Sequence, residues 1–207
     1  MIRHFLFLFS TTAAVLAAPL ERDLGQGLGY VRLQHLPADL PGAEAGRAKA
    51  CVLDARYTAA DADAAKAFVA WLKFRATPRA PVFVLVNSDT ALTLLHTLTT
   101  GNPSTGIIVV GVASAQFRPD SPVTIAAEDE RRAYDALADG ATVEALLADN
   151  PGKARNDEAS LAKGQPGDVP VELPADAPPT KRTGPPVDVA LQRAIHLHRT
   201  LVALKRL

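Results

Sequence analysis

The sequence predicts an α/β domain whose sheet is mostly parallel and whose strands are joined by crossover helices. Three short apolar runs, residues 50–54, 82–86 and 107–112, have the composition of strands that are buried on both faces. A stretch with helical periodicity separates each run from the next. Strand, helix, strand, helix, strand is the order that parallel crossover units require.

The amino-terminal half begins with an alternating segment that starts at Gly29 and stops before Pro37, which predicts a first strand. Turn-forming residues at both ends of 37–46 predict a loop or a short helix after it. The strand at 50–54 follows. Asp61 is then placed to cap a helix that Pro78 brings to an end.

The carboxyl-terminal half adds a leucine-rich helix over residues 90–99, between the second and third apolar runs. Residues 123–125 predict a short extended element, and residues 126–137 predict a helix. Thr142 is placed to cap a last short helix over residues 142–149. The compact domain therefore spans residues 18–150.

Residues 1–17 have the pattern of a secretory signal peptide: a short basic start, an apolar run, and small residues before a cut after Ala17. A retained membrane anchor is the alternative, but the run falls short of the roughly 18 residues that a spanning helix needs. The mature protein is expected to be exported, either periplasmic or secreted. The alanine-rich, lysine-poor composition indicates a bacterial source.

Two segments follow the domain. Residues 151–187 contain 8 prolines, 4 glycines and no aromatic side chain, so they predict a disordered linker. Residues 188–207 predict an amphipathic helix that Asp188 caps. Such a helix is expected to pack back on its own domain. The alternative is a tethered helix that binds a partner or a second copy of the chain.

Charge, cysteine and metal patterns exclude several classes of protein. The chain has 22 basic and 22 acidic residues, so the sequence predicts no basic field to hold nucleic acid or an anionic membrane. Cys51 is the single cysteine and is expected to be buried. The acids at 128–130 are expected to form a solvated first helical turn, and His196 and His198 face different ways on a helix. Without a glycine-rich phosphate loop, the sequence predicts neither a metal nor a cofactor.

Three short motifs occur in succession between residues 27 and 91. They are Gly27-Leu28-Gly29-Tyr30-Val31-Arg32-Leu33, Cys51-Val52-Leu53-Asp54-Ala55-Arg56, and Pro81-Val82-Phe83-Val84-Leu85-Val86-Asn87 followed by Thr90-Ala91. In order and spacing they resemble the core of the tail-specific (C-terminal processing) serine peptidases, whose fold is of the ClpP and crotonase kind. The family motifs are G-Y-I-R-L, L-D-L-R-N-N-P-G-G, and a strand followed by T-A-S-A-S-E. The resemblance covers about residues 27–150.

The residues that would catalyse the family's reaction are missing. Matched by position, the nucleophilic serine falls on Leu92, which cannot attack a carbonyl. The glycine turn near the oxyanion site is replaced by residues 57–60, and residues 111–117 hold no lysine to serve as the general base. The resemblance therefore implies a protein with no catalytic residue.

The remaining family positions predict a peptide-binding surface. Its residues are Asp54, Arg56, Asn87, Thr90, Ala91 and Leu92. The alternative for Asp54 and Arg56 is that they pair with one another or with the backbone.

The expected function is therefore that of an exported, catalytically inactive relative of a tail-specific peptidase that binds a peptide or a protein in the cell envelope. A second hypothesis is a hydrolase with relocated groups, for which Asp54, His96, Ser88 and Ser114 supply the residue types. The plainer role of Ser88 or Asp89 is to cap the next helix. A third hypothesis is an envelope structural or assembly protein that forms homo-oligomers through its C-terminal helix.

Overall fold

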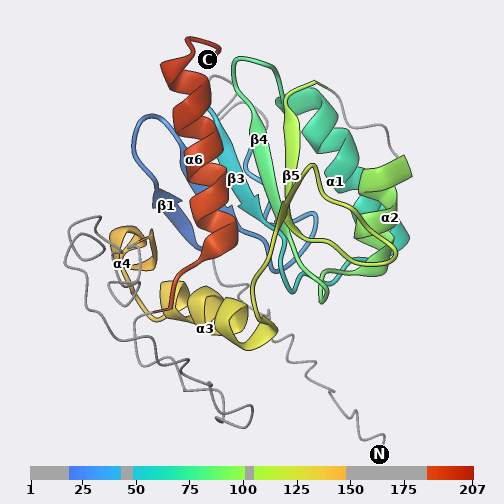
Figure 1. The fold of residues 1–207 in the computed structure, drawn as a ribbon. Helices are drawn as coiled ribbons and strands as arrows, with labels where there is room; N and C mark the ends of the chain where they lie inside the picture. The colour runs from blue at the N-terminus through green and yellow to red at the C-terminus, as the bar shows by residue number, and fades with distance from the viewer. Residues whose placement is uncertain (1–18, 43–48, 101–104, 148–185) are drawn as a thin grey trace, which may run out of the picture.

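The computed structural model describes residues 19–42, 49–100, 105–147 and 186–207. These residues form a sheet of six strands whose spatial order follows the chain, from β1 to β6 (Figure 1). β1 is antiparallel to β2, and the other neighbours are parallel. The strands are β1 (Glu21–Asp23), β2 (Gly29–Arg32), β3 (Cys51–Asp54), β4 (Val82–Val86), β5 (Ile107–Val112) and β6 (Ser121–Val123). The predicted α/β class with a mostly parallel sheet is confirmed.

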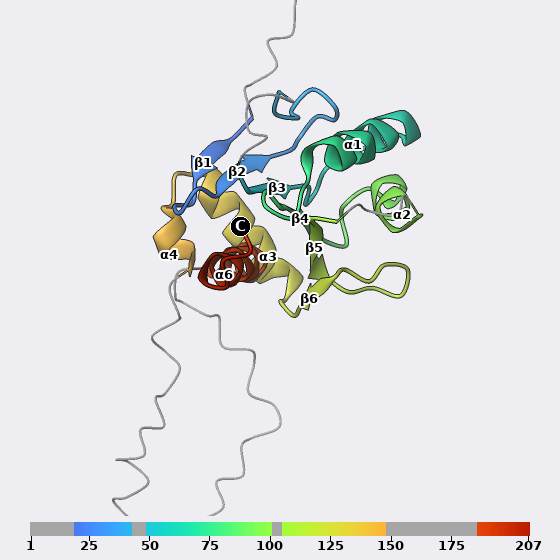
Figure 2. The same ribbon diagram turned by 90° about the horizontal axis from the view of Figure 1, so that it is seen from above.

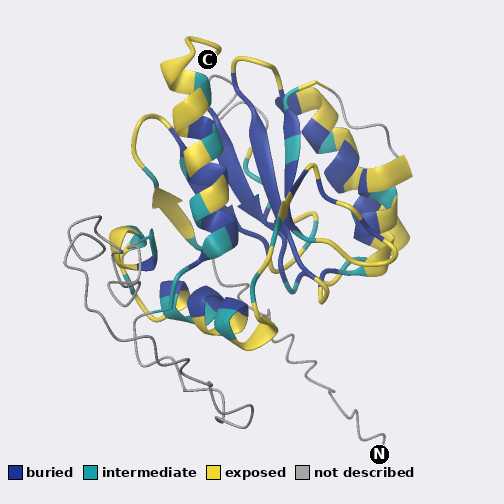
Figure 3. Cartoon of the chain, in the orientation of Figure 1, coloured by how far each residue is buried: buried dark blue, intermediate teal, exposed yellow. Residues whose placement is uncertain are grey.

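Helices cover both faces of this sheet (Figure 2). The first face carries the crossover helices α1 (Ala62–Arg75) and α2 (Leu92–Thr100), which pack on one another. The second face carries the helices that follow β6, which are α3 (Ala127–Ala138), α4 (Val143–Leu147) and α6 (Val189–Ala203). The sheet is therefore the middle of three layers, with its central strands buried on both sides (Figure 3).

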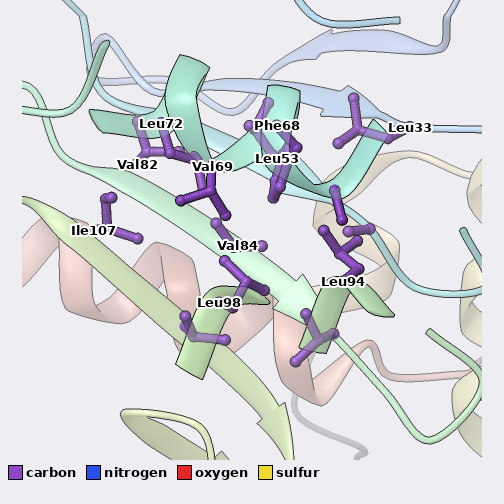
Figure 4. Close-up of a cluster of buried hydrophobic side chains, with 14 of the residues drawn as sticks. Leu33, Leu53, Phe68, Val69, Leu72, Val82, Val84, Leu94, Leu98 and Ile107 are labelled. Atoms are coloured by element: carbon purple, nitrogen blue, oxygen red, sulfur yellow. The ribbon is translucent and has the colours of Figure 1, made fainter. Parts of the chain in front are cut away.

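Alternation along the strands sends neighbouring side chains to opposite cores. In β4, Val82, Val84 and Val86 point to the first face, whereas Phe83 and Leu85 point to the second. The first-face core consists of apolar side chains from the sheet, α1 and α2 (Figure 4). Its labelled members are Leu33, Leu53, Phe68, Val69, Leu72, Val82, Val84, Leu94, Leu98 and Ile107.

Helix α6 closes the second face, as expected for a helix that packs on its own domain. Its side chains Ala190, Leu191, Ala194 and Ile195 are buried against the sheet. The predicted cap is confirmed, because the carboxylate of Asp188 accepts a hydrogen bond from the backbone N–H of Leu191 at 2.9 Å. Helix α6 is thus part of the folded core.

Other capping predictions divide into two groups. Asp61 caps α1 through the backbone N–H groups of Asp63 and Ala64, as predicted. The hydroxyl of Thr142 accepts from Ala145 N–H at the start of α4, which is also as predicted. The prediction that Ser88 or Asp89 caps α2 is wrong, because the helix begins at Leu92, and its first carbonyl acceptor is that of Ala91.

Two sheet edges also differ from the predictions. The sequence pattern did not indicate β1, whose side chains are all exposed. The last strand runs over Ser121–Val123 rather than residues 123–125, with Pro122 inside it. Proline is tolerated there because β6 is an edge strand, whose outer N–H groups have no ladder partner to lose.

The predicted signal peptide at residues 1–17 lies outside the described residues, as does nearly all of the predicted linker at 151–187. Within the described ranges, no helix combines the length and apolar character that a membrane crossing requires.

Candidate functional site

The candidate site lies at the edge of the sheet where the parallel strands end, which we call the carboxyl edge. Register places the last residues of neighbouring strands side by side, with Arg32 of β2 opposite Asp54 of β3. Both side chains point to the second face, because they continue the alternation of Tyr30 and Val52. In open α/β sheets, this edge is where ligands usually bind.

Arg56 is the centre of the carboxyl edge and lies between two carboxylates. It donates to Asp54 from Nε (2.9 Å) and Nη2 (2.6 Å), and to Asp188 from Nη1 (3.0 Å) and Nη2 (2.8 Å). None of the three residues has measurable exposure to solvent. Paired, two-point bonds of this kind are the strongest that guanidinium groups form. The ion pair between Asp54 and Arg56, which was one of the two alternatives at the level of sequence, is therefore present. Asp188, the cap of α6, adds a second carboxylate to it.

Aromatic and cationic side chains extend this cluster toward α3. The hydroxyl of Tyr30 donates to Asp54 Oδ2 at 2.7 Å, and Arg32 Nε donates to that hydroxyl at 3.3 Å. Arg32 also donates to the backbone carbonyl of Tyr134 at 2.6 Å and stacks 3.7 Å from the centre of its ring. Buried polar groups at this edge are thus held by neighbours within the protein.

Asn87 and Thr90 build the corner between β4 and α2. The Thr90 hydroxyl donates to the carbonyl of Ala55 at 3.1 Å and accepts from Asn87 N–H at 3.0 Å. The amide oxygen of Asn87 accepts from the N–H groups of Tyr57 and Asp89. These bonds fix the loops after β3 and β4 to one another.

Glu130 is the least satisfied member of the carboxyl edge. Its Oε2 accepts from Asn87 Nδ2 at 3.4 Å, whereas its buried Oε1 has no hydrogen-bond donor and lies 4.0 Å from Arg56 Nη1. The expectation of a solvated first turn at 128–130 is therefore wrong for Glu130, which is 3% exposed. The helix turns this side chain toward the sheet, and Glu128 away from it.

Burial and pairing act in opposite directions on the acids. Burial alone would raise the pKa of Asp54, but the charge of Arg56 and hydrogen bonds from Arg56 and Tyr30 hold that pKa below its ordinary value. For Glu130, burial outweighs the attraction of Arg56, and its pKa is raised. Burial lowers the pKa of Arg56, but Asp188 and Asp54 more than reverse this, so the guanidinium stays charged.

The accessible rim of the site consists of the turn after β3 and the start of α2. Leu92 is 64% exposed, and Ala91 is partly exposed beside it. Tyr57 has a left-handed backbone (φ 61°), and its ring meets that of Tyr134 edge to face at 4.8 Å. Arg131 lies 4.7 Å from the centre of the Tyr57 ring. The rim therefore offers apolar and aromatic surface.

The six residues predicted to bind a peptide fall into two layers. Asp54, Arg56, Asn87 and Thr90 are buried, and Ala91 and Leu92 reach the surface. A peptide could contact Arg56 only if α6 moved away, because Asp188 occupies that side of the guanidinium. The four buried residues support the corner between β4 and α2, and of the six predicted residues only Ala91 and Leu92 are accessible to a peptide.

The groups named for a relocated catalytic triad are not assembled. Asp54 is bound by Tyr30 and Arg56 rather than by a histidine, and His96 is exposed on α2. The hydroxyl of Ser114 accepts from two N–H groups of its own turn. No group of three metal-binding side chains occurs in the described ranges.

Sequence reasoning missed the partners that complete the cluster, namely Tyr30, Arg32, Glu130, Tyr134 and Asp188. Asp188 carried a local signal as a helix cap, but nothing local connects it to Arg56, which is 132 positions away. Tyr30 and Arg32 carried a weak signal, since they lie on one side of a strand beside the apolar pattern.

Two surface hollows have volumes of about 410 and 270 Å³, and of the cluster residues only Tyr30 lines either of them. The first lies along β1 and β2, and the second lies between β6 and α6. Comparison of the chain with models of protein families, with curated proteins and with solved structures finds no match.

Proposed function

We propose that the chain is an exported, catalytically inactive relative of the tail-specific serine peptidases, of the ClpP and crotonase kind, and that it binds a peptide or protein partner. The observation that carries the proposal is Leu92. At the position of the family's nucleophile, this side chain is 64% exposed on a corner whose polar groups are bonded internally. Such a corner offers contact area and no reacting group.

Kinship with the family is supported by the turn after β3. In the motif Leu-Asp-Ala-Arg-Tyr, Tyr57 stands where the family has asparagine, and its backbone is left-handed. Asparagine adopts that conformation several-fold more readily than most residues. The backbone thus keeps a conformation that suits the family residue better than the tyrosine that is present.

Loss of catalysis is supported by what surrounds Leu92. A serine peptidase needs a nucleophile with a base in hydrogen-bond reach. Asn87 and Thr90 bond to one another and to neighbouring backbone, and the carboxylate of Glu130 receives its bond from Asn87. The buried polar side chains of this corner, Asn87 and Thr90, have structural partners, whereas Ser88 and Asp89 are exposed beside them.

The binding surface consists of Leu92 and Ala91, flanked by Tyr57 and Arg131. Aromatic and arginine side chains are enriched at protein interfaces, and an exposed leucine gains from burial there. The rigid corner beneath them, tied by Asn87, holds these groups in place before a partner arrives.

The test of binding is an array of immobilised peptides probed with residues 18–207. We expect a subset of peptides to retain the protein, and the variant Leu92→Asp to lose at least about tenfold in affinity, because a charge replaces the buried contact. The matched control is Leu204→Asp at the end of α6, since Leu204 is also 64% exposed. Equal retention of the wild type and Leu92→Asp would refute the proposal.

The hydrolase alternative has its own test. The wild type and the variants Ser88→Ala and Ser114→Ala are incubated with an unstructured protein, and products are followed by mass spectrometry. We expect no cleavage above the blank. Cleavage that one variant abolishes would assign a rebuilt site to that serine and overturn the inactive assignment.

A further inference from the structure

The chain as a whole is neutral, but its exposed cations differ in their surroundings along the strand direction. At the carboxyl edge, the exposed cations Lys66 and Arg132 are paired with Asp63 and Asp129. The opposite edge, where the parallel strands begin, is reached by the carboxyl ends of α1 and α6 (Figure 1). We call this opposite side the amino-edge face.

The amino-edge face is basic. Six exposed cations lie on it, namely Lys49 before β3, Lys73 in the last turn of α1, Arg79 before β4, and Arg199, Lys205 and Arg206 at the end of α6. None of these cations forms an ion pair with another described residue. Within the described ranges, the acids nearest to these cations along the strand direction include Asp23 at the end of β1 and Asp120 just before β6. A net charge near zero therefore conceals a local positive surface.

Among the residues that the structure describes, three of the four exposed large apolar side chains share this face. Val202 (40% exposed) and Leu204 (64%) are at the end of α6, and Phe74 (49%) is at the end of α1. Each is adjacent in sequence or within one helical turn to a basic residue, such as Lys73 or Lys205. Apolar side chains at helix ends, ringed by cations, are the arrangement with which peripheral proteins insert into the headgroup region of a bilayer.

We propose that the amino-edge face binds the surface of an anionic lipid bilayer. The cations match lipid phosphates, and the apolar side chains of α6 match the upper acyl region. The first surface hollow borders this face at Lys49 and Asp23, but neither hollow is lined by Leu204, Val202 or Phe74. A bilayer needs projecting side chains rather than a pocket.

This placement has an orientational consequence. With the amino-edge face on a membrane, the carboxyl edge and Leu92 point away from it, because the two edges lie at opposite ends of the strands. A partner bound at Leu92 would then be held at the membrane surface without competing for it. The membrane proposal does not depend on what Leu92 binds.

The experiment is sedimentation of residues 18–207 with vesicles. One set contains phosphatidylcholine alone, and the other contains phosphatidylcholine and phosphatidylglycerol in roughly equal parts. We expect binding to the second set alone, and weaker binding as salt is added. The double variant Lys205→Glu/Arg206→Glu should bind at least about tenfold more weakly, since each basic residue near such a surface contributes about fivefold. Leu204→Ser should also bind more weakly.

The matched control is Lys66→Glu/Arg118→Glu, which changes the net charge equally but alters the amino-terminal half of α1 and the loop that follows the carboxyl end of β5. It should bind within about twofold of the wild type, and circular dichroism checks that each variant is folded. An equal loss in both double variants would show that net charge alone drives binding and would overturn the proposal. Absence of vesicle binding, together with retention on immobilised heparin, would overturn it in favour of a soluble polyanion.

Discussion

The two faces of the sheet are stabilised by different means. Under α1 and α2 the buried side chains are mostly apolar, from Leu33 at one edge to Ile107 at the other, with the buried Arg75 of α1 as an exception. Under α3, α4 and α6 an apolar core of similar extent ends in a buried ionic cluster, with Arg56 at its centre. The same strands serve both faces, and the difference arises from the residue at which each strand ends.

The ionic cluster fixes the position of α6 on the sheet. An apolar face holds its helices by area alone, so a helix can shift along it at modest cost. The two-point bonds between Arg56 and Asp188 instead fix one position of α6, because they form in one geometry only. The second face therefore gains a defined register for a helix that arrives from a distant part of the chain.

Removing α6 is expected to have the largest effect. A chain that ends at Pro186 exposes Phe83 and Leu85 to water and leaves Arg56 with half of its partners. We expect the truncated chain to lose its cooperative thermal transition. Circular dichroism and calorimetry measure this transition.

The control for this truncation deletes residues 152–183 and keeps α6. Its free energy of unfolding should stay within about 1 kcal/mol of the wild type. The reason is that Asp188 N–H already donates to the carbonyl of Leu146 at 3.0 Å, so the described residues on either side of the deletion are in contact. A truncated chain that still unfolds cooperatively with wild-type stability would show that α6 is dispensable for the second face.

Removing Arg56 from the ionic cluster is expected to cause the second-largest loss of stability. Arg56→Ala leaves the carboxylates of Asp54 and Asp188 buried without a counter-charge, which should cost about 4 kcal/mol of unfolding free energy. Urea denaturation measures the change. Arg131→Ala, which removes an exposed arginine from an exposed pair with Asp135, should leave the urea midpoint close to that of the wild type. Similar losses in the two variants would contradict a central role for Arg56.

The first face can be weakened by a cavity instead. Leu72→Ala removes a fully buried side chain between α1 and the sheet and should cost about 3 kcal/mol. Because no charge is involved, this loss of unfolding free energy should be similar at low and high salt. It should also be similar from pH 5 to pH 8. A loss that varies strongly with pH would show that the two faces are coupled.

The smallest expected effect is a pH dependence that belongs to Glu130. Its raised pKa means that the folded state binds a proton more tightly than the unfolded state, so stability falls as pH rises from 4.5 through that pKa. Glu130→Gln should remove this fall and be more stable than the wild type at pH 7, with the difference shrinking toward acidic pH. Thermal unfolding across this range measures it.

Asp54 should act in the opposite direction at lower pH. Its pKa is depressed, so its contribution to stability is present above 3.8 and is lost as pH falls through the pKa of the folded state.

The control for Glu130→Gln is Glu128→Gln, which changes an exposed neighbour on α3 and should leave the pH dependence of stability unchanged. A difference between Glu130→Gln and the wild type that stays constant with pH would contradict the assignment to Glu130.

Much of the fold follows from local patterns in the sequence. The runs at 82–86 and 107–112 coincide with β4 and β5, because β-branched residues buried on both faces have no other regular structure to form. Asp61, Thr142 and Asp188 cap the helices that they were expected to cap. Strand β1 could not be predicted, since three exposed charged residues carry no periodic signal.

The candidate site was predictable only in part. Asp54, Arg56, Asn87 and Thr90 were singled out, and the fold does bring their corners together. Their burial was not predictable, because it depends on Asp188 and α6, which lie beyond a long intervening segment. The inward turn of Glu130 likewise depends on how α3 rotates against the carboxyl edge.

By itself, then, the sequence determined the order of the buried strands and crossover helices and the caps at Asp61, Thr142 and Asp188, since each depends on neighbours within a few positions. Only the tertiary structure decided that Arg56 is closed off by Asp188 and that six exposed cations lie where the parallel strands begin. The physical reason is that electrostatic interactions act between groups that are close in space, whereas propensity and capping act along the chain.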